Sequence, residues 1–123
     1  MNRICIIPAR FNSKRIKRKN IKRFNGEPII SLTINKVIES KCFDKVFVST
    51  DSEVIKKIAE KNGAIVPFLR SLKLSKDTIT TYEVVRDFVQ KLLKLDFKFE
   101  NIFIIYPTSI CTKISHIKKA IKI

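Results

Sequence analysis

The sequence has only two glycines and four prolines among its 123 residues, which excludes a collagen-like or low-complexity chain. It has no tryptophan and one histidine, and no nucleophile–base pattern accompanies that histidine. The three cysteines are an odd number without close spacing, so we expect reduced thiols rather than a disulfide framework or a zinc site.

Long hydrophobic runs are also missing. The longest, such as residues 4–9 and 102–106, have the length of a strand and are too short to span a membrane. Basic residues follow the apolar start of the chain at once, which is not the order of a secretory signal. We therefore expect a cytoplasmic protein that makes no contact with a membrane.

Acidic residues are scarce, because 11 Asp and Glu face 26 Lys and Arg and leave a formal net charge of +15. The first 24 residues hold nine of the basic residues and no acidic one. A cluster this dense repels itself unless it is solvated or neutralised, so an anionic partner is one interpretation and a solvated basic surface is the other.

Apolar runs of strand length alternate with helical patterns along the whole chain. We expect strands at Arg3–Pro8, Lys45–Ser49, 65–68 and 101–106, the first and last of them buried on both faces. Helical spacing predicts helices at 28–40, 53–62 and 82–93, with Gly63 ending the second, and a last one at 114–121. This order predicts an α/β fold: one domain over residues 1–123, with a Rossmann-like, mostly parallel sheet and helices on both faces.

Ligands of such sheets bind beyond the carboxyl ends of the strands, where the loops 9–27, 50–52 and 107–112 meet. The first loop has Gly26 as its only glycine, which excludes a P-loop and the dinucleotide fingerprint. Its lysines and arginines suit a polyphosphate. A nucleic-acid patch is less well supported, because the loop has only two aromatic residues, Phe11 and Phe24, and no RNA-binding signature.

Residues 6–21 read IIPARFNSKRIKRKNI, and this string resembles the signature loop of the acylneuraminate cytidylyltransferase family. Further similar blocks follow in the same order: VSTDS at 48–52, GA at 63–64, VPFLR at 66–70, LSKDT at 74–78 and YPTS at 106–109. The blocks look most like the pseudaminic-acid branch of that family. The sequence departs from the family pattern at Lys17 and Ile110, where proline is usual, and at Phe11 and Asn12, where glycines are common.

The resemblance implies a fold of the nucleotide-diphospho-sugar transferase type, truncated here to the N-terminal half of the usual family domain. It implies a nucleotidyltransferase that binds CTP and, in a full-length enzyme, transfers CMP to a nonulosonic acid such as pseudaminic or sialic acid. Mg²⁺ is the implied cofactor and a homodimer is possible, while the truncated chain is expected to be inactive alone. The alternative is a small basic nucleic-acid-binding module.

The resemblance also assigns roles to individual residues. The triphosphate would be bound by Arg10, Ser13, Lys14 and Lys19. The three basic residues among them are also the catalytic candidates. These cations would neutralise the charge that develops on the phosphates in the transition state. The ribose and the cytosine would be contacted by Asn20, Arg70 and Thr81.

The alternatives for the remaining candidates are structural. Thr81 is also a candidate for the cap of a helix. Tyr106 is assigned to the sugar side of the pocket, or else to the core as a strand-end aromatic. Asp51 is a weak metal candidate that we interpret first as a helix N-cap, while the metal aspartates of the family lie beyond this chain. We expect Asp77 to shape its loop and His116 to be a surface or packing residue.

Overall fold

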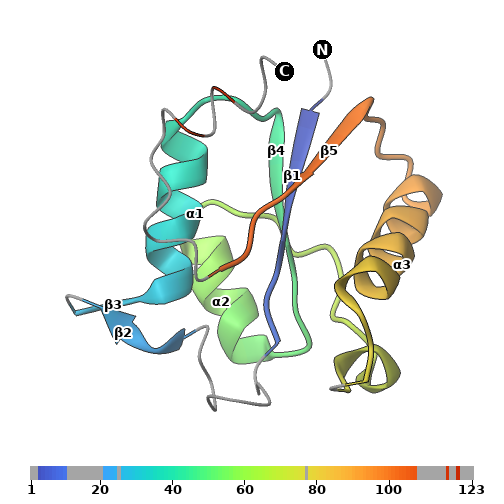
Figure 1. The fold of residues 1–123 in the computed structure, drawn as a ribbon, viewed down its shortest axis with the longest axis horizontal. Coiled ribbons are helices and arrows are strands. Elements are labelled where there is room, and N and C mark those ends of the chain that lie inside the picture. The colour runs from blue at the N-terminus through green and yellow to red at the C-terminus, as the bar shows by residue number, and fades with distance from the viewer. Residues whose placement is uncertain are drawn as a thin grey trace.

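A three-stranded parallel sheet lies at the centre of the computed structural model, which describes residues 3–10, 21–24, 26–76, 78–107, 116 and 119. Its strand order is β4-β1-β5, with bounds Lys45–Ser49, Arg3–Pro8 and Asn101–Ile104 (Figure 1). The middle strand pairs with both neighbours, so that Ile6 lies between Phe47 and Ile104. The predicted parallel sheet is confirmed.

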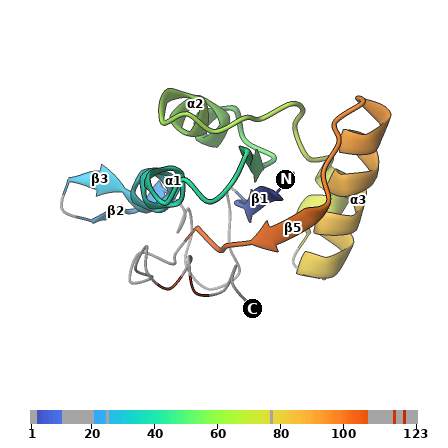
Figure 2. The same ribbon diagram turned by 90° about the horizontal axis from the view of Figure 1, so that it is seen from above.

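Helices cover both faces of this sheet. The helices α1 (Ile29–Glu39) and α2 (Glu53–Lys61) lie on one side of the strands, and α3 (Thr81–Lys94) lies on the other (Figure 2). Successive side chains of a strand point to opposite faces, which divides β1 between two cores.

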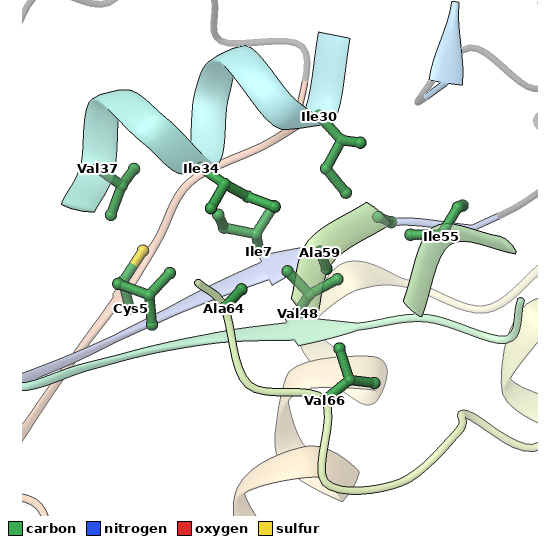
Figure 3. Packing of buried hydrophobic residues seen from close by; sticks show 12 residues of the cluster. Cys5, Ile7, Ile30, Ile34, Val37, Val48, Ile55, Ala59, Ala64 and Val66 are labelled. Atoms are coloured by element: carbon green, nitrogen blue, oxygen red, sulfur yellow. The ribbon is translucent and has the colours of Figure 1, made fainter. Parts of the chain in front are cut away.

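The first core lies beneath α1 and α2. Cys5 and Ile7 of β1 pack there with Ile34 and Val37 of α1, as Figure 3 shows. The second core lies beneath α3, where Ile4, Ile6 and Phe47 pack against its residues Phe88 and Leu92. The Phe47 and Phe88 rings meet edge to face, with centroids 5.9 Å apart.

The helix ends correct two predictions. The N-cap of α2 is Ser52, whose hydroxyl accepts from the amides of Val54 and Ile55, so Asp51 is not the cap. The N-cap of α3 is Thr80, which forms a capping box with Glu83, so Thr81 is the first helical residue instead.

The stop predicted at Gly63 is confirmed, because its φ is 95° and its amide donates to the Glu60 carbonyl. The prediction of a strand at 65–68 is wrong, because in this segment only Ile65 pairs with the sheet, through an isolated bridge to Phe47. Between this bridge and α3 lies a short 3₁₀ helix, η2 (Leu72–Ser75).

The last strand lies at an edge of the sheet and is shorter than predicted. Ile102 and Ile104 are 38% and 44% exposed, so the strand is not buried on both faces. Among the described residues β5 pairs with β1 alone, so the backbone N–H and C=O groups of its outer edge have no strand partner there.

Two short strands, β2 (Arg23–Phe24) and β3 (Glu27–Pro28), form an antiparallel pair at the end of the stretch predicted to be a loop. Pro28, predicted as the first residue of the helix, belongs to β3 and is the N-cap of α1. Gly26 has a φ of 84° at the turn between the two strands, a conformation that glycine adopts without strain. Strands of two residues leave no periodic pattern in a sequence, which is why this pair could not be predicted.

Of the final predicted helix, the structure describes only His116 and Lys119, which have helical backbone and exposed side chains. Ile114, Ile117 and Ile121 lie outside the described residues. Within the part of the chain that the structure describes, no helix has the length and apolar character needed to cross a bilayer.

Candidate functional site

A pocket of about 180 Å³ opens beyond the carboxyl ends of β1 and β5, at the start of α3. It is lined by Pro8, Arg10, Arg70, Leu74, Lys76, Ile79, Thr81, Val84, Tyr106 and Pro107. These residues come from the exit of β1, the segment between α2 and α3, the first turn of α3 and the exit of β5. The pocket therefore lies at the edge where a parallel sheet is expected to bind its ligand.

The pocket has apolar walls and a few polar groups. Proline, leucine, isoleucine and valine side chains supply the walls, and three cations and two hydroxyls supply the polar atoms. Such a lining suits a flat, partly polar ring with an anionic extension, because the walls exclude water and the polar groups fix the orientation of the ligand.

Arg70 is the most buried of the cations, at 8% exposure. Its Nη2 donates to the Ser49 carbonyl at 3.0 Å, and its backbone amide donates to the Thr50 carbonyl at 2.6 Å. Its Nε is buried and has no hydrogen-bond partner among the described residues. A buried donor without a partner costs free energy, and a ligand that supplies an acceptor removes that cost.

Charges of both signs lie near Arg70. Burial has the largest effect and lowers the pKa of its guanidinium, the nearby carboxylate of Asp51 raises it, and the cation of Arg10 lowers it. The net pKa is about 10. Arg10 and Arg70 are thus close enough to repel each other, although separate loops supply them. A pocket that holds two repelling cations favours an anionic ligand.

Arg10 ties the first loop to the 3₁₀ helix. Its Nη1 donates to the carbonyl of Ser75 at 3.1 Å, at the last residue of η2. This bond joins segments 65 residues apart and fixes one edge of the pocket.

Thr81 and Tyr106 meet at another edge of the pocket. The hydroxyl of Tyr106 donates to the Thr81 hydroxyl at 3.4 Å. Because Thr80 caps α3, the Thr81 side chain is not engaged as the helix cap. Tyr106 is 52% exposed. This excludes the interpretation of Tyr106 as a core aromatic.

Four of the candidates named from the sequence come together in this pocket: Arg10, Arg70, Thr81 and Tyr106. The others, together with Asp77, lie outside the described residues: Ser13, Lys14, Lys19 and Asn20. Sequence reasoning assigned no role to Lys76, nor to the wall residues Leu74, Ile79 and Val84. The LSKDT block did carry a signal for the first two of these positions, because it contains Leu74 and Lys76.

The described residues do not form a magnesium site by themselves. Nowhere in residues 3–10, 21–24, 26–76, 78–107, 116 and 119 do three His, Cys, Asp or Glu side chains gather as metal ligands. Asp51, the metal candidate, lies close enough to Arg70 to stabilise its charge. Magnesium as a cofactor therefore stays a prediction.

Comparison with known proteins gives a consistent result along the chain. The family profile described as Cytidylyltransferase matches residues 4–122. The chain is 37% identical over 123 residues to the CMP-N,N'-diacetyllegionaminic acid synthase of Legionella pneumophila, covering 100% of this chain and 53% of that protein. It is 40% identical over 109 residues to the pseudaminic acid cytidylyltransferase of Campylobacter jejuni, covering 89% of this chain and 47% of that protein.

Solved structures agree on the fold. The structure of CMP:2-keto-3-deoxy-manno-octonic acid synthetase in complex with CTP superposes with a TM-score of 0.80 at 15% identity, over 99% of this chain and 46% of that one. The structure of a cytidylyltransferase from Leptospira borgpetersenii superposes with a TM-score of 0.72 at 19% identity, over 99% of this chain and 48% of that one. The expected nucleotide-sugar transferase fold is confirmed. The chain spans about half the length of the curated relatives it matches.

Proposed function

We propose a function from one premise, which is that this chain belongs to the cytidylyltransferase family. Its pocket binds the cytosine and ribose of CTP, and cations at the rim bind the phosphates. One observation carries the proposal: the pocket has apolar walls and is lined by Arg70, whose buried Nε–H has no partner in the part of the chain that the structure describes.

Base recognition follows from this donor. Cytosine has neighbouring acceptors at N3 and O2, which a guanidinium N–H and the Thr81 hydroxyl could satisfy. Uracil carries a hydrogen at N3 and would oppose a donor there. A site built on polar contacts rejects a ligand that leaves those contacts unpaired, and this is how we expect the pocket to select CTP.

We assign phosphate binding to the basic loop after β1. Arg10 enters the pocket from that loop, and we assign Ser13, Lys14 and Lys19 to the same task, with Asn20 on the ribose. Nucleotidyl transfer needs no covalent nucleophile. It requires that charge be neutralised on the α-phosphate and on the departing pyrophosphate, which positively charged side chains can do.

In a full-length enzyme, the anomeric hydroxyl of a nonulosonic acid would attack the α-phosphorus of CTP. A bond forms between that oxygen and the α-phosphorus, the bond to the β-phosphate breaks, and pyrophosphate leaves. The names of the Legionella and Campylobacter relatives support a sugar acid of this class as acceptor. We assign Tyr106, at the exposed edge of the pocket, to the sugar side.

A titration tests the binding proposal. CTP, UTP, ATP and a short RNA are titrated separately into the chain at low and at high salt. We expect CTP to bind most tightly and to retain its preference at high salt. Binding that ignores the identity of the base and falls steeply with salt would instead indicate the basic nucleic-acid module, which the comparisons do not support.

A second assay addresses turnover. The chain is incubated with Mg²⁺, CTP and either pseudaminic or sialic acid, and released pyrophosphate is measured. We expect no release above background, because such reactions depend on an acceptor held in line and no acceptor site is evident in the described residues. Robust turnover would contradict this expectation while leaving the CTP site intact.

A further inference from the structure

Lys76 is the one cation of the pocket to which neither the sequence nor the proposed function gives a role. It follows η2 directly, lines the pocket with Arg10 and Arg70, and has an exposed side chain. Its segment is irregular, and so no helical or strand pattern marks it.

The position of Lys76 is fixed from both sides. The Ser75 carbonyl, one peptide before Lys76, accepts the hydrogen bond from Arg10. The Lys76 carbonyl itself accepts from the amide of Ile79, and the Ser75 hydroxyl donates to the Ser71 carbonyl. The bond from Arg10 therefore brings the backbone of Lys76 to the edge of the pocket that Arg10 lines.

The charge balance at this edge is also uneven. Asp51 raises the pKa of Arg70 and so partly compensates the deepest cation. Among the described residues, the Lys76 ammonium forms no ion pair, and the ion pair on the neighbouring helix joins Lys91 to Asp87. Lys76, Arg10 and Arg70 all line the pocket, so an anion bound there would be attracted by three cations.

We propose that Lys76 binds a phosphate group of the nucleotide, at the edge of the pocket that Arg10 also lines. This inference rests on the proposed function and extends it, because it adds a second segment of the chain to the phosphate site. A lysine acts there as a mobile point charge, and this suits an extended polyphosphate better than a fixed planar group. Ligand binding would then add a second link between Arg10 and the segment after η2, beside the hydrogen bond from Arg10 to Ser75.

The test is a series of ligands with increasing phosphate content. Cytidine, CMP, CTP and tripolyphosphate are titrated into the unaltered chain and the variants Lys76→Ala, Lys76→Arg and Lys73→Ala. Lys73 is the matched control, since it is an exposed lysine of η2 that does not line the pocket. We expect Lys76→Ala to weaken CTP binding about tenfold, the scale of one charge-assisted contact. CMP should lose less, cytidine should be unaffected, and Lys76→Arg should retain most of the affinity.

Two outcomes would overturn the role of Lys76. In one, Lys76→Ala binds CTP as tightly as Lys73→Ala does. In the other, Lys76→Ala weakens cytidine as much as CTP, which would mean that the substitution distorts the pocket. Failure of the proposed function gives a different result: the unaltered chain would bind tripolyphosphate but not cytidine, and the effect of Lys76→Ala would still be read on tripolyphosphate. A chain that binds none of the four ligands would contradict both proposals.

Discussion

The buried hydroxyl of Thr33, in the middle of α1, donates a 2.6 Å hydrogen bond to the carbonyl of Pro107, which lies 74 residues later and lines the pocket. It joins the helix on one face of the sheet to the segment that leaves β5. Tyr106 is the neighbour of this anchored carbonyl. The bond therefore holds one wall of the pocket in place from outside the pocket.

Thr33→Val should destabilise the fold and loosen this wall. Valine keeps the shape of threonine but removes the donor, so the buried Pro107 carbonyl loses its partner at a cost of ~1–3 kcal/mol. Urea denaturation measures the change in unfolding free energy. Thr33→Ser, which keeps the hydroxyl, should lose less, and equal stability of the serine and valine variants would show that the bond contributes little.

Arg10→Ala should weaken CTP binding by ~1.5–3 kcal/mol, the range of hydrogen bonds to charged groups. Arg10 lines the pocket and its guanidinium would face the phosphates. The measurement is a calorimetric titration with CTP. Arg86→Ala, which removes an exposed arginine of α3 away from the pocket, is the control and should bind as the unaltered chain does.

Arg70→Met should abolish the preference for CTP over UTP and change the unfolding free energy by less than about 2 kcal/mol. The Ser49 carbonyl loses its partner, but removal of a buried charge offsets that loss. Competition titrations and thermal unfolding separate the two effects. A variant that stays folded and still distinguishes CTP from UTP would contradict the assignment of the base to Arg70.

Cys5 should resist alkylation while the chain is folded. Burial raises the pKa of its thiol to about 12 from the ordinary 9.0, so little thiolate forms at pH 8. Cys42, which is only half-buried, is the internal comparison and should react first under iodoacetamide, as mass spectrometry can follow.

The same shift makes stability depend on pH. A raised pKa means that the folded state keeps a proton that the unfolded state releases, so the stability from this group is complete below pH 9. It should fall as the pH rises from 9 towards 12. A Cys5→Ser variant should lack this component of the alkaline loss.

Asp51→Asn should leave the effect of Mg²⁺ on CTP binding unchanged, because the carboxylate of Asp51 acts on Arg70 rather than as part of a metal cluster among the described residues. CTP is titrated with and without Mg²⁺ against the unaltered chain, Asp51→Asn and the control Asp87→Asn, whose carboxylate pairs with Lys91 on α3. Loss of the Mg²⁺ effect in Asp51→Asn alone would make Asp51 a metal ligand.

The sequence predicted those parts of the fold that depend on local pattern. The bounds of β1 and β4 agree with prediction because both strands are continuous apolar runs between polar residues. The end of β5 was overestimated, since Ile105 and Tyr106 extend the apolar run although the ladder of paired residues stops at Ile104. Apolar character reports burial or strand propensity, and by itself it cannot tell an edge strand from a central one.

The site was predicted through motif resemblance more than through physics. Arg10, Arg70, Thr81 and Tyr106 were named because their blocks match a family, and the structure gathers them in one pocket. Lys76 was given no role, because its place depends on a hydrogen bond between residues 65 positions apart. No local pattern encodes such a contact. The caps at Ser52 and Thr80 were misassigned by one residue for a related reason, since adjacent polar side chains compete for the same helix end.

The place of β1 between β4 and β5 has a consequence for how the molecule is made. A ribosome releases residues 3–61 first, so β1, α1, β4 and α2 can assemble while the rest is still being synthesised. Asn101–Ile104, Tyr106 and Pro107 emerge afterwards, and only then can the other side of β1 be paired and the last wall of the pocket added. The capacity to hold a ligand is thus acquired late in synthesis, after two of the three strands of the sheet are already in place.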